Sequence, residues 1–134
     1  MKKIEHIGIA VKDIVASNDL FGKLFDKTHY KTETVESEGV MTSFFKVGPN
    51  KIELLQATHE ESPIAKFIEK KGEGIHHIAF AVDDIESEIE RLKAEGFRMI
   101  HEQPKKGADN KLIAFLHPKA TNGVLIELCQ DIEK

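Results

Sequence analysis

Two histidines and two glutamates, residue types that bind divalent metal ions, recur at matching places in the two halves of this chain. His6 lies in IEHIGIAVKDI over 4–14 and His77 in IHHIAFAVDDI over 75–85, and seven of these eleven positions are identical. Glu53 lies in the segment KIEL, and Glu127 lies in the similar segment LIEL. Two pairs of similar segments, in the same order and at nearly the same spacing, indicate an internal duplication.

The four residues have the donor types of a mixed nitrogen and oxygen metal site. Imidazole and carboxylate ligands suit Co, Mn, Fe, Ni or Zn, whereas a thiolate-type structural zinc site needs several cysteines. Small residues follow each histidine on the same side of its strand, which leaves room for a ligand. Taken singly, each residue also fits a plain role, as a hydrogen-bonded histidine or a solvent-facing glutamate. Their equivalent positions favour the metal site.

Periodicity and turn residues predict the order βαβββ in each half. The first half should have a strand over 3–11, a helix capped by Asp13 and ending near 25, and strands near 29–36, 40–47 and 51–56. The second should have a strand over 75–82, a helix over about 84–95, and strands near 97–102, 111–116 and 123–129. We therefore predict an α+β fold with module one at about 1–58, a connecting helix at about 62–71 and module two at about 74–131, in a single domain over 1–134.

Composition and charge limit which partners and which cellular compartment this chain is expected to have. The chain has 134 residues, 40% hydrophobic and 31% charged, and a net charge of −4, which gives no support for nucleic-acid binding. No apolar run approaches the roughly 20 residues that span a bilayer, and no apolar stretch follows the two N-terminal lysines as in a secretory signal. The single cysteine, Cys129, fits a reducing compartment and a packing role. We expect a cytoplasmic protein with no nucleic-acid or membrane partner.

Longer segments resemble the methylmalonyl-CoA epimerase family of the vicinal oxygen chelate superfamily, which also includes glyoxalases, bleomycin resistance proteins and dioxygenases. They are HIGIAVKDI (6–14), KIELLQ (51–56), SPIAKFIEKKGEGIHHIAFAVDDI (62–85) and AFLHPKATNGVLIEL (114–128). The resemblance implies a glyoxalase-like, cleft-shaped mixed sheet built from both modules, and a homodimer. It also implies one divalent ion in the cleft, held by His6, Glu53, His77 and Glu127.

The reaction implied by this resemblance is the interconversion of (R)- and (S)-methylmalonyl-CoA through a metal-stabilised enolate. Inversion needs two acid/base groups, and Glu127 is a candidate for one because it would lie close to the bound acyl-CoA. The second group stays open among Glu38, His76, His101 and His117. Some epimerases carry glutamine at the position of Glu53, and some carry a glutamate, proposed as a base, where this chain has Thr42. Threonine is not a general base at neutral pH.

Further residues could contact the substrate. Lys119, in the His117-Pro118-Lys119 segment, could meet a phosphate or carboxylate of the substrate, or could simply be solvated. The polar stretch over 104–110 could line the entrance for CoA, although its composition favours a plain exposed turn.

Three other functions exist within the same superfamily. A glyoxalase-type lyase would act on a glutathione hemithioacetal, but the only arginines, Arg91 and Arg98, offer little for gripping the carboxylates of glutathione. A non-catalytic binding protein would not need all four metal-ligand residues. A ring-cleaving dioxygenase would use two histidines and one carboxylate. The hemithioacetal lyase and the binding protein are the main alternatives to the epimerase.

Overall fold

The computed structural model describes residues 1–132, and these residues form two compact units. One unit comprises His6–His76, and the other comprises Met1–Glu5 together with the residues from His77 onward. Each unit contains the predicted βαβββ order of one module. The prediction that 1–134 form a single domain stays a prediction.

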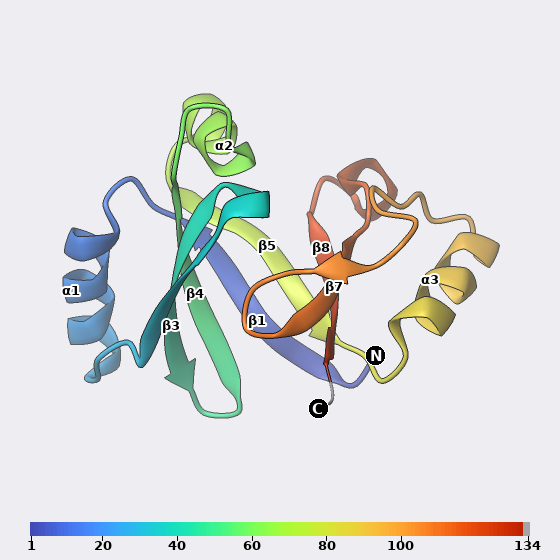
Figure 1. Cartoon of the computed structure of the whole chain (residues 1–134), viewed down its shortest axis with the longest axis horizontal. Coiled ribbons are helices and arrows are strands. Elements are labelled where there is room, and N and C mark those ends of the chain that lie inside the picture. The colour runs from blue at the N-terminus through green and yellow to red at the C-terminus, as the bar shows by residue number, and fades with distance from the viewer. Residues whose placement is uncertain (133–134) are drawn as a thin grey trace. The chain divides into compact units, whose positions relative to one another are not determined.

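The first unit is a four-stranded mixed sheet with two helices (Figure 1). Its strands are β1 (Lys3–Ala10), β2 (Lys31–Val35), β3 (Val40–Val47) and β4 (Asn50–Ala57), in the order β2-β3-β4-β1. Only the part of β1 from His6 onward belongs to this unit. Strand β1 runs parallel to β4, and the other neighbours are antiparallel. The helices are α1 (Ile14–Phe25) and α2 (Pro63–Lys71), and a short 3₁₀ turn, η1 (Glu36–Glu38), joins β2 to β3.

Local sequence explains where these helices begin. The Asp13 side chain accepts hydrogen bonds from the amides of Val15 and Ala16, and the Ser62 side chain caps α2 in the same way. Helix α1 packs on one face of the sheet through a cluster that includes Ile14, Phe45 and Leu54. Helix α2 covers part of the other face through Ile64, Ala10, Val40 and Leu55. The connecting helix predicted at 62–71 is therefore confirmed.

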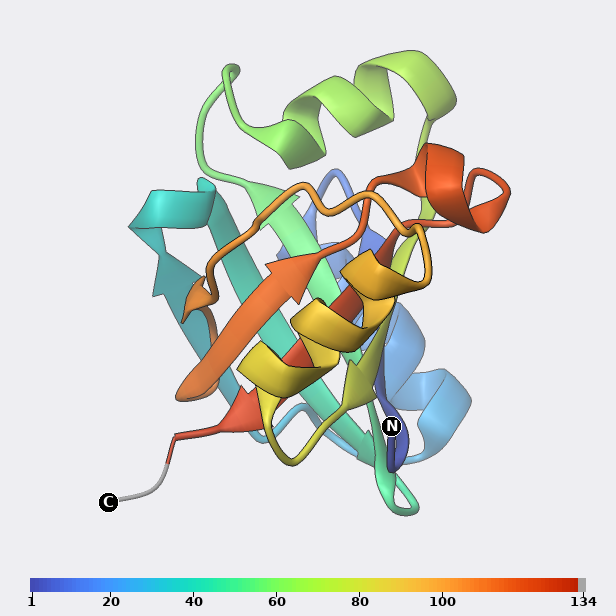
Figure 2. The same ribbon diagram turned by 90° about the vertical axis from the view of Figure 1, so that its right-hand side faces the viewer.

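The second unit repeats this plan with β5 (Gly74–Ala81), α3 (Ile85–Ala94), β6 (Lys105–Lys106), β7 (Lys111–Phe115) and β8 (Ile126–Asp131). Only the part of β5 from His77 onward belongs to this unit. Its strand order is β5-β8-β7-β6, with β5 parallel to β8. Helix α3 lies across β7 and β8 (Figure 2). It packs through Ile85, Ile89 and Leu92 against Ala114 and Leu128. A 3₁₀ turn, η2 (Pro118–Thr121), joins β7 to β8.

Two predicted strands of this module are wrong in extent. Residues 97–102 contribute only a bridge from Met99 to Leu116, because the amides of Ile100 and His101 both donate to the carbonyl of Phe115 and so break the ladder. The sixth strand lies instead at Lys105–Lys106, inside the stretch predicted to be a loop or turn. The strand predicted at 123–129 begins at Ile126, because Asn122 and Gly123 have φ values of 58° and 86° and form a turn.

Candidate metal centre

In the first unit the parallel pairing of β1 and β4 brings His6 to Glu53. The register sets Glu53 opposite Gly8, and His6 lies two residues earlier on the same side of β1. Because Gly8 has no side chain, the space above it stays open for both groups. The His6 Nδ1 atom lies 3.2 Å from the Glu53 Oε2 atom, and both side chains are buried. A buried carboxylate and a buried imidazole thus lie in contact on this face of the sheet.

The second unit contains the equivalent pair, His77 and Glu127, on β5 and β8. Here Glu127 stands opposite Ala79, two residues after His77, so the register matches that of the first unit. The His77 Nε2 atom lies 2.9 Å from the Glu127 Oε1 atom, and both side chains are again buried. The sequence repeat therefore extends to the contact between the two side chains.

Aromatic packing holds the second pair in place. The ring of Phe115, which stands opposite Glu127 on β7, meets the His77 imidazole edge-on with centroids 5.6 Å apart. Phe115 is itself positioned by His101, whose Nδ1 accepts a hydrogen bond from the Phe115 amide at 3.2 Å. In the first unit Phe44 stands opposite Glu53 in the same way and is fully buried.

The chemistry of these donors fits a divalent ion. Each pair offers one imidazole nitrogen and one carboxylate oxygen with almost no exposure to water, and a buried carboxylate is costly without a cation or hydrogen bonds. First-row divalent metals accept this donor set, and the negatively charged carboxylate of a pair would offset part of the charge of an ion that the pair binds. His6 and Glu53 could therefore hold a metal, and so could His77 and Glu127.

Two of the other sequence candidates, His76 and His117, take part in local packing and capping contacts. His76 packs edge-on against Phe67 of α2, with ring centroids 5.0 Å apart. The Nδ1 atom of His117 accepts a hydrogen bond from the backbone amide of Lys119 and so caps η2. The Lys119 side chain in this turn is exposed. Glu38 ends η1 and has a buried carboxyl oxygen.

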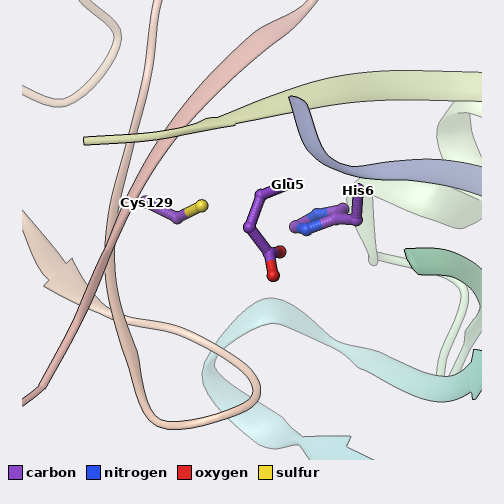
Figure 3. A group of neighbouring side chains, drawn as sticks. All are labelled: Glu5, His6 and Cys129. Carbon is purple, nitrogen blue, oxygen red and sulfur yellow. The ribbon is translucent and has the colours of Figure 1, made fainter. Parts of the chain in front are cut away.

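A buried carboxylate that sequence reasoning did not single out lies near the N-terminus. Glu5 belongs to the second unit, where its Oε2 atom is 3.8 Å from the Nζ atom of Lys111 on β7. Lys111 also pairs with Asp131. The Cys129 thiol donates to the Phe80 carbonyl at 3.5 Å and points toward Glu5 (Figure 3). Strand alternation could have found Glu5, because it falls on the side of β1 that carries Ile7.

Comparison with known proteins agrees with this geometry. A sequence model described as the Glyoxalase/Bleomycin resistance protein/Dioxygenase superfamily matches residues 5–115. The chain belongs to this superfamily. The mitochondrial methylmalonyl-CoA epimerase of Dictyostelium discoideum is 41% identical, with 94% of this chain and 76% of that protein covered. The ethylmalonyl-CoA/methylmalonyl-CoA epimerase of Cereibacter sphaeroides is 39% identical, with 96% of this chain and 97% of that protein covered.

Solved structures of this superfamily show the same fold. A variant of the Streptomyces coelicolor methylmalonyl-CoA epimerase, in complex with 2-nitronate-propionyl-CoA, matches with a TM-score of 0.94 and 34% identity. The match covers 98% of this chain and 95% of that chain. The predicted α+β, glyoxalase-like fold of two tandem βαβββ modules is confirmed, and so is the resemblance to the methylmalonyl-CoA epimerase family.

Proposed function

We propose that this chain is a metal-dependent epimerase that interconverts (R)- and (S)-methylmalonyl-CoA. The observation that carries the proposal is the pair of buried His–Glu contacts at equivalent registers, His6 with Glu53 and His77 with Glu127. Relatives named as epimerases cover nearly the whole chain, and the structure neighbours named as epimerases include complexes with acyl-CoA compounds. These findings support an acyl-CoA substrate and an epimerase reaction.

The reaction defines what the residues must do. The carbon between a thioester and a carboxylate is a weak acid, and inversion there means removing its proton on one face and returning a proton on the other. A bound divalent ion would supply Lewis-acid stabilisation of the negative charge that develops on the thioester oxygen. His6, Glu53, His77 and Glu127 would be its ligands. Glu127 would also exchange a proton with the substrate, since a ligand lies next to whatever the ion binds.

The native metal is proposed to be one of Co, Mn, Zn, Ni or Fe, on the basis of the donor types alone. We also propose a cytoplasmic homodimer, as the resemblance and the single cysteine suggested, although relatives of this chain include mitochondrial epimerases. Within residues 1–132, none of the helices has the length and apolar character needed to cross a membrane. Lys119, exposed on η2, and His117, which caps that turn, stay proposed contacts for the acyl-CoA.

Proton exchange at the α carbon of methylmalonyl-CoA in D₂O tests this proposal directly. We expect NMR to show deuterium incorporation when Co or Mn is added to the metal-free protein, and none in the His77→Ala variant. The His29→Ala variant is the control, because His29 packs on Phe45, outside both His–Glu pairs, and should leave the exchange intact.

The epimerase proposal fails if a folded, metal-loaded protein catalyses no exchange. Assay with a glutathione hemithioacetal would then test the lyase alternative. Arg91 is a poor candidate for binding the glutathione carboxylates, because its guanidinium already donates to Glu88 on α3. Absence of bound metal after preparation with excess Co or Mn would instead favour a non-catalytic binding protein.

A further inference from the structure

The exposed side of helix α2 carries a hollow with a basic rim. Its volume is about 310 Å³, which lies at the lower end of the range for small-molecule sites. The residues that line this α2 hollow are Lys66, Phe67, Glu69, Lys70 and Lys71. Lys66 and Lys70 are one helical turn apart, as are Phe67 and Lys71, so these four side chains share one face of the helix. The α2 hollow therefore places three ammonium groups around one aromatic ring.

The three lysines at this rim carry charge that no carboxylate neutralises. All three are exposed, and none of them forms an ion pair with any residue of 1–132. On other elements of the chain Lys23 and Lys93, by contrast, each pair with a carboxylate. With Glu69 as the single carboxylate in the lining, three positive charges and one negative charge leave the α2 hollow at +2. A cluster of this kind attracts phosphate groups.

Phe67 gives the α2 hollow an apolar floor. Its half-buried ring packs on the cluster around Ile64 and meets the His76 ring edge-on, with centroids 5.0 Å apart. The ammonium of Lys71 lies over the ring at 5.9 Å from its centroid, near the outer limit of a cation–π contact. A flexible side chain thus covers this face of the ring and can move aside. A flat base can then stack on Phe67.

Helix α2 lies beside Glu53 within the first unit, at one end of β4 (Figure 1). Ile64 of α2 packs on Ala10 and Leu55, which stand opposite one another on β1 and β4. Their row is the next one beyond Glu53 on the same face, roughly 7 Å along the strands. Lys70 is roughly 9 Å further along the helix than Ile64. A long flexible pantetheine arm separates the thioester of an acyl-CoA from its nucleotide, so a thioester near Glu53 leaves the nucleotide able to reach the α2 hollow.

We propose that the α2 hollow binds the adenine nucleotide end of the acyl-CoA substrate. This inference rests on the proposed function. The adenine ring stacks on Phe67, and the ammonium groups of Lys66, Lys70 and Lys71 contact the phosphates. Glu69 accepts a hydrogen bond from the ribose hydroxyl. These residues bind and position the substrate, and none of them exchanges a proton with the α carbon.

Kinetics with two substrates test this site. The Lys66→Gln/Lys70→Gln variant should raise the KM for methylmalonyl-CoA about 10-fold and leave kcat nearly unchanged, because the lost contacts are remote from the reacting carbon. The KM for methylmalonyl-pantetheine, which has the same acyl group and no nucleotide, should equal that of the wild type. The Lys12→Gln/Lys46→Gln variant is the matched control, because it removes two exposed lysines outside α2 and should leave both KM values unchanged.

Direct binding separates this inference from the epimerase proposal. Adenosine 3′,5′-bisphosphate, titrated into the intact protein by calorimetry, should bind the Lys66→Gln/Lys70→Gln variant about 10-fold more weakly than the wild type. Phe67→Leu should also weaken binding, whereas Phe67→Tyr keeps the ring and should retain it. This measurement needs no catalysis, so failure of the proposed function would appear separately, as a metal-loaded wild type that exchanges no α proton.

Three results would overturn the α2 hollow as a nucleotide site. One is an unchanged KM for methylmalonyl-CoA in the Lys66→Gln/Lys70→Gln variant. Another is an equal rise in the KM for methylmalonyl-pantetheine, which would indicate a structural effect on the reacting end. The third is displacement of the bisphosphate by an equal concentration of inorganic phosphate, which would reduce the α2 hollow to a general anion patch.

Discussion

Each His–Glu pair combines two groups that are individually costly to bury. Neither Glu53 nor Glu127 has much access to water, and each lies within about 3 Å of an imidazole nitrogen. Their equivalent positions suggest equal roles as ligands. Their proposed chemistry differs, because only Glu127 is also expected to exchange a proton with the substrate.

Amide substitutions should separate these two roles. Glu53→Gln keeps an oxygen donor but loses a charge, so we expect metal affinity to fall about 10-fold or more and exchange activity to recover at saturating metal. Glu127→Gln should stay below wild-type inversion by about 10²-fold even at saturating metal, because an amide cannot accept the proton. Titration of activity against Co or Mn concentration measures both effects. Full recovery of Glu127→Gln would contradict its acid/base role.

Helix α3 shows how a single element is stabilised by charge. The Glu88 carboxylate accepts a 2.6 Å hydrogen bond from Arg91 Nε and lies 3.2 Å from the N-terminal ammonium. The hydrogen bond from Arg91, together with the nearby ammonium, holds the pKa of Glu88 below its ordinary value of 4.5. Because the pKa is lower in the folded state, this contribution to stability is present above pH 4.5 and is lost as the pH falls through the folded-state pKa.

The Glu88→Gln variant should therefore lose stability only when the carboxylate is ionised. We expect its free energy of unfolding to be about 0.5 kcal/mol below that of the wild type at pH 7, and the difference to shrink in acid. Urea unfolding at a series of pH values measures this difference. Glu90→Gln on the same helix is the control, because its exposed carboxylate lies 3.9 Å from Lys93 and should contribute less. A difference that persists unchanged at pH 3 would exclude the ion pair as its cause.

At the scale of the whole molecule, the proposed metal centre would take its ligands from both halves of the chain. A ligand that binds only the folded state stabilises it by about 2.7 kcal/mol at 100 times its Kd. For a chain of 134 residues this corresponds to a rise in Tm of roughly 10 °C. We also expect one bound ion per chain, because four ligands shared between two pairs suit a single centre.

Calorimetry and metal analysis of the intact protein check this expectation. Removal of His6 or of His77 should each abolish the rise in Tm, whereas His29→Ala, a histidine outside both pairs, should retain it. Two ions per chain, each lost independently with its own pair, would contradict a shared centre.

Much of the fold was predictable because its signals are local. Asp13, Ser62 and Asp84 each cap a helix that begins at the next residue, and alternating apolar residues mark the strands near them. The irregular segment before β6 was not predictable in this way. Its path depends on two amides sharing the carbonyl of Phe115, a partner more than ten residues away.

The four ligand candidates were also found from sequence, because a duplication preserves them at equivalent positions and a repeat can be read without knowing which strands pair. The tertiary structure decided the contacts that a repeat cannot specify. The register of β1 on β4 brings His6 within 3.2 Å of Glu53, and that of β2 on β3 aligns Glu33 with Thr42. Register arises from hydrogen bonding between distant segments, and shifting it by one residue would turn each side chain to the opposite face.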